Sequence, residues 1–290
     1  MRKPKIKDVE AAAPEASNIH EIGTGAFKVV YRANINGNDE ALKIAQIPGD
    51  TPEAKQENIA RIHREIKTLQ ECRCPHLVKL GTVAPREVTI SGDDFILYSE
   101  EFIPGNSLRE IIKLGSLPPI EQLVEIGLGV LDAVNELSKF GIVHRDIKPE
   151  NLMMTSIPGR KCILLDLGIA FKMGGTLLTG NAFFIPGTIY YIAPEMLEPG
   201  FRNNLDSRAD IYTIGLTIYE FASGKNPFMN QGDNNTTLFR IQTTTPVSLE
   251  ILRPDLPKEF CKLIDQMIKK IPALRPANIS RLMKKMEAFL

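Results

Sequence analysis

The sequence predicts an α+β protein with a small sheet-rich part followed by a larger, mostly helical part. Segments rich in β-branched and aromatic residues, which are typical of strands, dominate before Pro104. Apolar residues at helical spacing dominate after it. Pro104-Gly105-Asn106 between them is typical of a turn. We therefore expect a first domain over residues 18–103 and a second over 104–290, preceded by residues 1–17.

The expected elements follow from local patterns. Residues 1–17 are rich in Lys, Ala and Pro without a periodic apolar face, so they predict a flexible lead-in. Thr51 and Pro52 suit the start of a helix whose apolar stripe runs from Ile59 to Leu69. Strands are expected over 28–33, 40–44, 78–83, 87–90 and 95–102. Further helices are expected over 108–114, 120–140, 211–223, 258–271 and 279–289.

Composition excludes several function classes. Lys plus Arg equal Asp plus Glu at 35 each, so no bulk charge favours nucleic acid or a membrane surface. The four cysteines show neither disulfide density nor a repeated metal-ligand spacing, which favours structural thiols in a reducing compartment. No apolar run approaches the roughly 18 residues of a membrane span. We expect a cytoplasmic protein with no membrane span and no nucleic-acid partner, and leave its oligomeric state open.

The run from His144 to Asn151 carries the groups that phosphoryl transfer needs. Asp146 can accept a proton from a hydroxyl, Lys148 can neutralise a phosphate and Asn151 can coordinate Mg²⁺. Such a transition state requires mainly positioning and charge neutralisation. Twenty residues after Asp146, an apolar segment ends in Asp166, a second hard oxygen ligand. A solvated, charged turn is the alternative for either motif alone.

A second group of residues can hold phosphates. Gly23 and Gly25, between two strand-like segments, let the backbone approach a ligand because glycine has no Cβ. Lys43 follows on the next expected strand, and Glu65 lies inside the apolar stripe of the expected helix. Taken singly, the glycines are typical of a turn and the two charges of a protein surface. Their order along the chain decides the interpretation.

In that order, the motifs resemble the catalytic domain of eukaryotic-type protein Ser/Thr kinases over about residues 19–289. The resemblance implies a bilobal protein-kinase-like fold, ATP with Mg²⁺ or Mn²⁺ as cofactors, and protein substrates with Ser or Thr acceptors. Lys148 and Thr188 favour Ser and Thr over Tyr. A pseudokinase or nucleotide-binding scaffold is the alternative. A small-molecule kinase is disfavoured by Lys148 and by Ala193-Pro194-Glu195.

The resemblance also implies individual roles. Asp146 is the base with Lys148 beside it, Asn151 and Asp166 bind the metal, and Lys43 binds phosphates and pairs with Glu65. The implied nucleotide-binding residues are Ile22, Gly23, Gly25, Lys28, Val30, Ala41, Lys43, Glu101, Ile103 and Met153. The implied structural residues are Glu195, in a buried ion pair with Arg275, and Asp210, which braces the catalytic loop. The implied regulatory residues are the candidate phosphorylation sites Thr176 and Thr179, Thr188 in the same segment, and Arg145, a phosphate partner.

Two positions depart from the family pattern. Lys28 stands where the third glycine of the phosphate loop is usual, and we expect it to make a second contact beside Lys43. Glu100 stands where a hydrophobic residue or Thr usually gates the adenine pocket. A buried carboxylate there needs a partner or water. Either a bulge shifts the register or the pocket is unusually polar.

Overall fold

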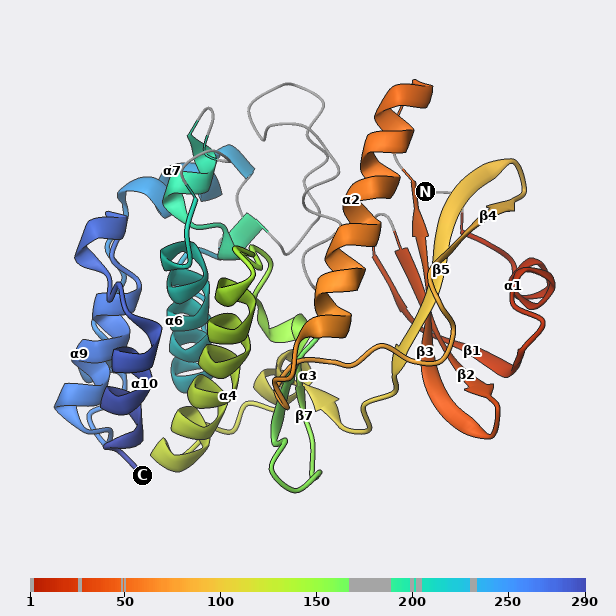
Figure 1. Ribbon diagram of the computed structural model, residues 1–290. Helices are drawn as coiled ribbons and strands as arrows, with labels where there is room; N and C mark the ends of the chain where they lie inside the picture. The colour runs from red at the N-terminus through yellow and green to blue at the C-terminus, as the bar shows by residue number, and fades with distance from the viewer. Residues whose placement is uncertain are drawn as a thin grey trace. The chain divides into compact units, whose positions relative to one another are not determined.

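The computed structural model describes residues 3–25, 28–47, 49, 51–166, 189–198, 201, 205–229 and 234–290, and it divides the chain into two units (Figure 1). The N-terminal unit comprises the described residues up to Cys72 together with Val78–Pro104. The C-terminal unit comprises Arg73–Leu77 and the described residues from Gly105 onward. The first unit is built on a sheet and the second is mostly helical, which confirms the predicted α+β class.

The N-terminal unit contains a five-stranded antiparallel sheet in the order β1-β2-β3-β5-β4. Its strands are β1 (Ala16–Thr24), β2 (Lys28–Ile35), β3 (Asn38–Gln46), β4 (Arg86–Ile90) and β5 (Asp93–Glu101). Asn36-Gly37 and Ser91-Gly92 close two of its hairpins with positive φ at both positions. These two-residue turns match the twist of the strands, and the first sets the register that places Lys43 opposite Val30.

The two faces of this sheet pack against different helices. On one face Leu42 and Leu97 join a core with Val9 of α1 (Ile6–Ala12). On the other, Ile96 and Tyr98 pack with apolar residues of α2 (Pro52–Glu71), the long orange helix of Figure 1. Side chains alternate along a strand, so a residue between Leu42 and Ile44 faces α2. The sheet thereby directs the predicted phosphate-binding lysine toward the α2 side.

Two segments of this unit differ from expectation. Residues 6–12 of the expected flexible lead-in form helix α1, because Val9 and Ala13 are fully buried in the sheet core despite the lack of a long apolar stripe. The expected strand over 78–83 is irregular. The side chains of Glu40 and Ser99 accept the N–H groups of Thr82 and Val83. Backbone bonds join Lys79, Gly81 and Val83 to β5 without forming a regular ladder.

The C-terminal unit is organised around helix α6 (Arg208–Ser223), which is buried along nearly its whole length. Helices α4 (Ile120–Lys139) and α9 (Lys258–Met267) pack on α6, and α10 (Ile279–Glu287) packs on α4 (Figure 1). Gly215 permits the close approach of α9, since a Cβ there would lie 2.6 Å from the Cβ of Met267. These contacts give α6 a fixed position in the unit.

Shorter elements complete the C-terminal unit. Helices α3 (Leu108–Lys113), α7 (Asn234–Thr243) and α8 (Leu249–Leu252) are short, and the last two were not expected from the sequence. A three-stranded sheet in the order β6-β7-β8 lies next to the predicted catalytic loop in sequence. Its strands are β6 (Asn106–Ser107), β7 (Leu152–Met154) and β8 (Cys162–Leu164). The 3-10 helices are η1 (Pro149–Asn151), η2 (Ile189–Tyr191), η3 (Pro194–Leu197) and η5 (Pro272–Leu274). In the part of the chain that the structure describes, no helix is both long and apolar enough to cross a membrane.

Candidate active site

The catalytic-loop backbone is held by a carboxylate of the buried helix α6. Asp210 is fully buried and accepts the N–H of His144 on one oxygen and the N–H of Arg145 on the other, each at 2.8 Å. Burial raises the pKa of Asp210 to about 6, and the two N–H bonds oppose that rise. Arg145 has a φ of +70°, a left-handed conformation that is unfavourable for a side chain of its kind. The bonds to Asp210 therefore stabilise a strained turn directly before Asp146.

His144 connects this turn to the end of the next strand. Its Nδ1 accepts the N–H of Asp146 at 3.3 Å, and its Nε2 lies 3.2 Å from the carbonyl oxygen of Leu165. This pattern requires a neutral ring with the proton on Nε2. Burial lowers the pKa of His144 to about 4, which is consistent with the neutral form.

Asp146 lies at the centre of the candidate catalytic group. The ammonium of Lys148 contacts both of its carboxylate oxygens, at 2.8 and 2.9 Å. Asn151 donates through Nδ2 to a carboxylate oxygen of Asp146 at 3.0 Å and to its backbone carbonyl at 2.8 Å. All three side chains are largely shielded from solvent. The structure thus brings the predicted base, cation and amide into direct contact and restricts the rotation of the Asp146 carboxylate.

Asp166 is brought toward the same loop by the residue before it. The N–H of Leu165 donates to the carbonyl of Asn151 at 2.8 Å, while the carbonyl of Leu165 faces His144. Asp166 itself has a φ of +53°, which aspartate tolerates better than most residues. Two connections through Leu165 therefore tie the position of Asp166 to that of Asn151.

Asn151 and Asp166 fit a magnesium site by the chemistry of their donors. The described residues contain no group of three or more His, Cys, Asp or Glu side chains that could hold a metal alone. Mg²⁺ takes oxygen ligands and usually keeps several waters, binding through one or two protein groups plus substrate phosphates. An amide oxygen and a carboxylate suit that mode of binding, in which the nucleotide supplies the remaining ligands.

Glu195 and Arg275 lie together in the C-terminal unit as the sequence predicts. The guanidinium makes a bidentate contact with the carboxylate at 2.6 and 2.8 Å. Its other N–H groups donate to the backbone carbonyls of Lys269, Lys270 and Arg208. It also stacks 4.7 Å from the ring centre of Tyr212. All five donors of Arg275 are therefore used, and the pair connects η3 to α6 and to the chain before η5.

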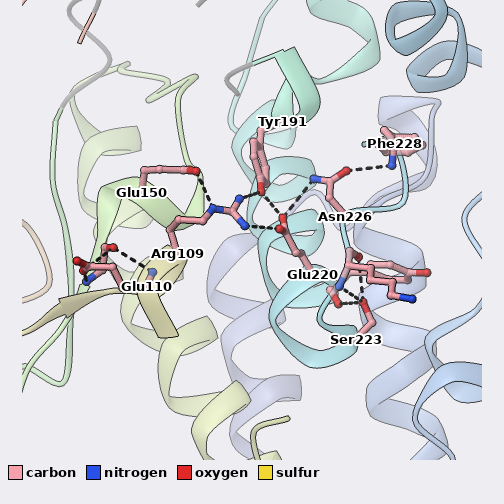
Figure 2. Close-up of polar contacts among 11 residues, drawn as sticks. Arg109, Glu110, Glu150, Tyr191, Glu220, Ser223, Asn226 and Phe228 are labelled. Atoms are coloured by element: carbon pink, nitrogen blue, oxygen red, sulfur yellow. Dashed lines mark hydrogen bonds and ion pairs between the residues drawn. The ribbon is translucent and has the colours of Figure 1, made fainter. Parts of the chain in front are cut away.

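A second charged cluster, not predicted from the sequence, connects α3 with α6 (Figure 2). Arg109 donates to Glu150 at 2.7 Å, to Glu220 at 2.5 Å and to the hydroxyl of Tyr191. Tyr191 donates in turn to Glu220, and burial raises the pKa of this phenol so that it keeps its proton. The cluster joins η1, next to Asn151, to η2. The signal in the sequence was Glu220, a carboxylate in a mostly apolar helix that therefore needs a buried partner.

In the N-terminal unit, part of the predicted nucleotide group shares one face of the sheet. Val30 lies opposite Lys43 in the ladder, and Ala41 is two residues before Lys43 on the same strand, so all three face the same side. The ammonium of Lys43 lies 2.5 Å from a carboxylate oxygen of Glu100. Glu100 pairs in register with Ala41, and no bulge interrupts the ladder there. Glu100 is therefore a buried carboxylate in regular register, which excludes the bulge that the sequence left open.

The remaining predicted nucleotide residues are distributed over several elements. Ile22 on β1 is half-exposed, and the N–H of Gly25 donates to the carbonyl of Lys28 at 2.8 Å, which closes the loop from β1 to β2. Glu101 is the last residue of β5, and its carboxylate accepts a hydrogen bond from the N–H of Lys79. Gly23 is on β1, Ile103 follows β5 and Met153 is on β7 of the C-terminal unit.

Several predicted residues remain untested by the geometry. Glu65 lies in α2, but its side chain is outside the described residues, so its pairing with Lys43 stays a prediction. Thr176, Thr179 and Thr188 also lie outside them. Arg145, the expected partner of a phosphate on Thr176 or Thr179, is described and half-buried beside Asp146.

Comparison with known proteins decides the family. Residues 16–286 match the family described as "Protein kinase domain". The chain belongs to the protein kinase domain family. This confirms the resemblance inferred from the motifs, and it extends over both units of the structure.

Curated relatives of this kinase domain come from several kingdoms. It is 29% identical to the serine/threonine-protein kinase Tao of Drosophila melanogaster over 96% of the chain and 25% of that protein. It is 31% identical to mitogen-activated protein kinase kinase kinase 3 of Arabidopsis thaliana over 88% of the chain and 38% of that protein. It is 27% identical to the probable serine/threonine-protein kinase PknB of Lactococcus lactis over 91% of the chain and 40% of that protein. The chain thus spans well under half the length of these relatives.

Solved structures share the fold. The PknI kinase domain of Mycobacterium tuberculosis matches with a TM-score of 0.66 at 20% identity, over 95% of this chain and 96% of that one. Rad53 1-466, in complex with AMP-PNP, matches with a TM-score of 0.70 at 22% identity, over 93% of this chain and 64% of that one. At these identities the likeness establishes the kinase fold alone.

Arg275→Met should destabilise the domain strongly. The substitution leaves the Glu195 carboxylate and three backbone carbonyls without their partner, and breaking such a buried pair costs about 3–5 kcal/mol. Urea unfolding at neutral pH measures the loss. Arg281→Met on the exposed face of α10 is the matched control and should change stability by less than about 0.5 kcal/mol. A similar shift in both variants would contradict a structural role for the Glu195–Arg275 pair.

His144→Gln should make the domain less sensitive to acid. The folded pKa of about 4 lies below the unfolded value of about 6.5, so the unfolded state binds the extra proton and stability falls as the pH drops through this window. Between pH 7 and 5 the wild type should lose about 2 kcal/mol more than the variant. Urea unfolding at both pH values measures the difference. Asp210 titrates in both proteins, so its contribution cancels when the two are compared. Equal losses of stability in the wild type and the variant would assign the acid sensitivity to groups other than His144.

Proposed function

We propose that the chain is an active protein serine/threonine kinase, which transfers the γ-phosphate of Mg·ATP to Ser and Thr hydroxyls of protein substrates. The contact of Asp146 with Lys148 and Asn151, on a loop anchored by Asp210, is the observation that carries the proposal. Two of the named relatives are described as serine/threonine-protein kinases and the third as a mitogen-activated protein kinase kinase kinase, which supports the proposal. A pseudokinase has no comparable support from the contacts of these residues.

The proposed roles follow from chemistry. Asp146 accepts the proton of the acceptor hydroxyl as the new oxygen–phosphorus bond forms. Lys148 and Asn151 hold the Asp146 carboxylate in one orientation, and Lys148 offsets negative charge beside it. When bound, Mg·ATP supplies the transferable phosphoryl group, an ADP leaving group and a cation that offsets charge on the phosphates. Acceptor specificity for Ser and Thr rests on Lys148 and Thr188.

The nucleotide side of the proposal rests on the N-terminal sheet. Lys43 binds the phosphates, while Val30 and Ala41 on the same face provide apolar contact for the adenine. Asn151 and Asp166 hold Mg²⁺, for which Mn²⁺ can substitute because it takes similar oxygen ligands. Glu65 is the proposed partner of Lys43 in the form that transfers phosphate, and Lys28 is a second phosphate contact.

Three further proposals concern the regulation of the domain, its location and its substrates. Phosphate on Thr176 or Thr179 pairs with Arg145 and orders the loop, since phosphate oxygens bind guanidinium strongly. A cytoplasmic location fits the four cysteines, none of which forms a disulfide, and burial raises the pKa of Cys74 and Cys162 to about 12. The substrates are proteins rather than nucleic acids, as the balanced net charge favours.

Removal of either central carboxylate should abolish phosphate transfer. Asp146→Ala loses the proton acceptor and Asp166→Ala loses a metal ligand, so each should lower incorporation of radiolabelled phosphate into a generic protein acceptor by about 100-fold or more. Retained nucleotide binding in both variants would show that they fold. Equal incorporation in the wild type and both variants would refute the catalytic assignment. Nucleotide binding without any transfer by the wild type would support the pseudokinase alternative.

The same assay distinguishes the two candidate phosphate-binding lysines. Lys43→Met should abolish transfer because the buried ammonium is lost, whereas Lys28→Gly should be tolerated because it restores the usual loop residue. Activity that survives in Lys43→Met and disappears in Lys28→Gly would reverse the assignment.

Autophosphorylation should place phosphate between residues 173 and 188. Intact-mass measurement followed by peptide mapping, after incubation with Mg·ATP, should find phosphate on Thr176 or Thr179. Asp146→Ala treated in the same way is the control and should remain unmodified. Phosphate confined to other segments, or absent from an enzyme that labels a generic acceptor, would eliminate this form of regulation.

A further inference from the structure

Glu100 forms a buried ion pair with the lysine that the proposed function assigns to phosphate binding. Lys43 on β3 lies opposite Tyr98 on β5, and Glu100 is two residues further along β5 on the same face. Such diagonal neighbours are within reach of long side chains. The ammonium and carboxylate are 2.5 Å apart, and each side chain is only 4% exposed. Ala41, directly opposite Glu100, presents no more than a methyl group there.

Burial makes this pair different from the surface pairs of the same unit. Lys55 and Asp94 also form an ion pair, at 2.8 Å, but both side chains are about 40% exposed and the interaction is screened by water and salt. The side chains of Lys43 and Glu100 are almost fully shielded from solvent, so the interaction between them is screened far less. The nucleotide's phosphates are anionic, and they need the same ammonium.

We propose that Glu100 competes with the phosphate groups of ATP for Lys43, and this inference rests on the proposed function. Glu100 stabilises the buried ammonium without nucleotide and weakens the binding of phosphates to it. It is a positioning residue that acts through Lys43 and sets how strongly the domain distinguishes nucleotides from nucleosides. The effect of Glu100 on affinity depends on phosphate charge, because adenosine has no phosphate group to contact the Lys43 ammonium.

Glu100→Gln isolates the charge, since glutamine has nearly the same shape and its amide oxygen can still accept a hydrogen bond from Lys43. The dissociation constants of Mg·ATP, Mg·ADP and adenosine, measured by calorimetry, are the readout. We expect the variant to bind ATP and ADP about tenfold more tightly than the wild type while its affinity for adenosine stays the same. Glu100→Thr, which also removes the charge, should change the affinities in the same direction.

Glu40→Gln is the matched control. Glu40 on β3 is another buried carboxylate of the sheet, but it lies on the face opposite to that of Glu100, where it accepts hydrogen bonds from Thr82 and Ser99. Its substitution should leave the ratio of ATP to adenosine affinity unchanged. A merely structural role for Glu100 would lower all affinities together, as damage to the sheet would.

The outcomes separate the inference from the proposed function. A folded wild type that binds neither ATP nor adenosine refutes the proposed function. A wild type that binds ATP, with an unchanged or weaker ATP affinity in Glu100→Gln, overturns the role of Glu100 alone. If both Glu100 variants unfold and lose adenosine binding, the pair is structural and the proposal is likewise wrong.

Discussion

The bond between Asp210 and the catalytic-loop backbone is the constraint on which the candidate site depends. A buried carboxylate is costly unless hydrogen bonds satisfy it, and both oxygens of Asp210 are used by consecutive N–H groups of the loop. These bonds hold Arg145 in a left-handed conformation that an isolated peptide would avoid. Asp146 follows directly, so its carboxylate is positioned by the body of α6. The packing of α4 and α9 on α6 makes that position rigid.

The same helix positions the other functional segments of the C-terminal unit. Glu220, near its end, holds Tyr191 of η2 and, through Arg109, reaches Glu150 of η1 (Figure 2). At its start, the carbonyl of Arg208 accepts from Arg275, which carries Glu195 of η3. The catalytic loop, η2 and η3 are thus each attached to α6 through a charged or charge-assisted contact. Such contacts are directional, which apolar packing is not, so they orient segments that have little core of their own.

Much of this was predictable where a signal is local in the sequence. Hairpins with Asn-Gly and Ser-Gly turns, and helices with a regular apolar stripe, follow from short-range rules. Helix α1 could not be predicted from such rules. It contributes to the core through Val9 and Ala13, which pack on a sheet whose strands lie further along the chain. The irregular path of 78–83 likewise depends on Glu40 and Ser99, side chains that become partners only after β3 and β5 have paired.

The pairings of charged residues show where sequence reasoning ends. Glu195 and Arg275 were predictable because the family resemblance supplied the partner across 80 positions. For Glu100 the sequence indicated only that a carboxylate needed a partner, and strand register was required to select Lys43. Burying ion pairs adds little net stability compared with apolar residues of the same volume. The pairs at Lys43 and Arg275 are therefore better explained by the side-chain positions they fix, although breaking either pair is costly once it is buried. Apolar contacts stabilise each unit from within: those of the sheet in the N-terminal unit and those of the helices around α6 in the C-terminal unit. The buried charges determine where a few reactive side chains lie in each unit.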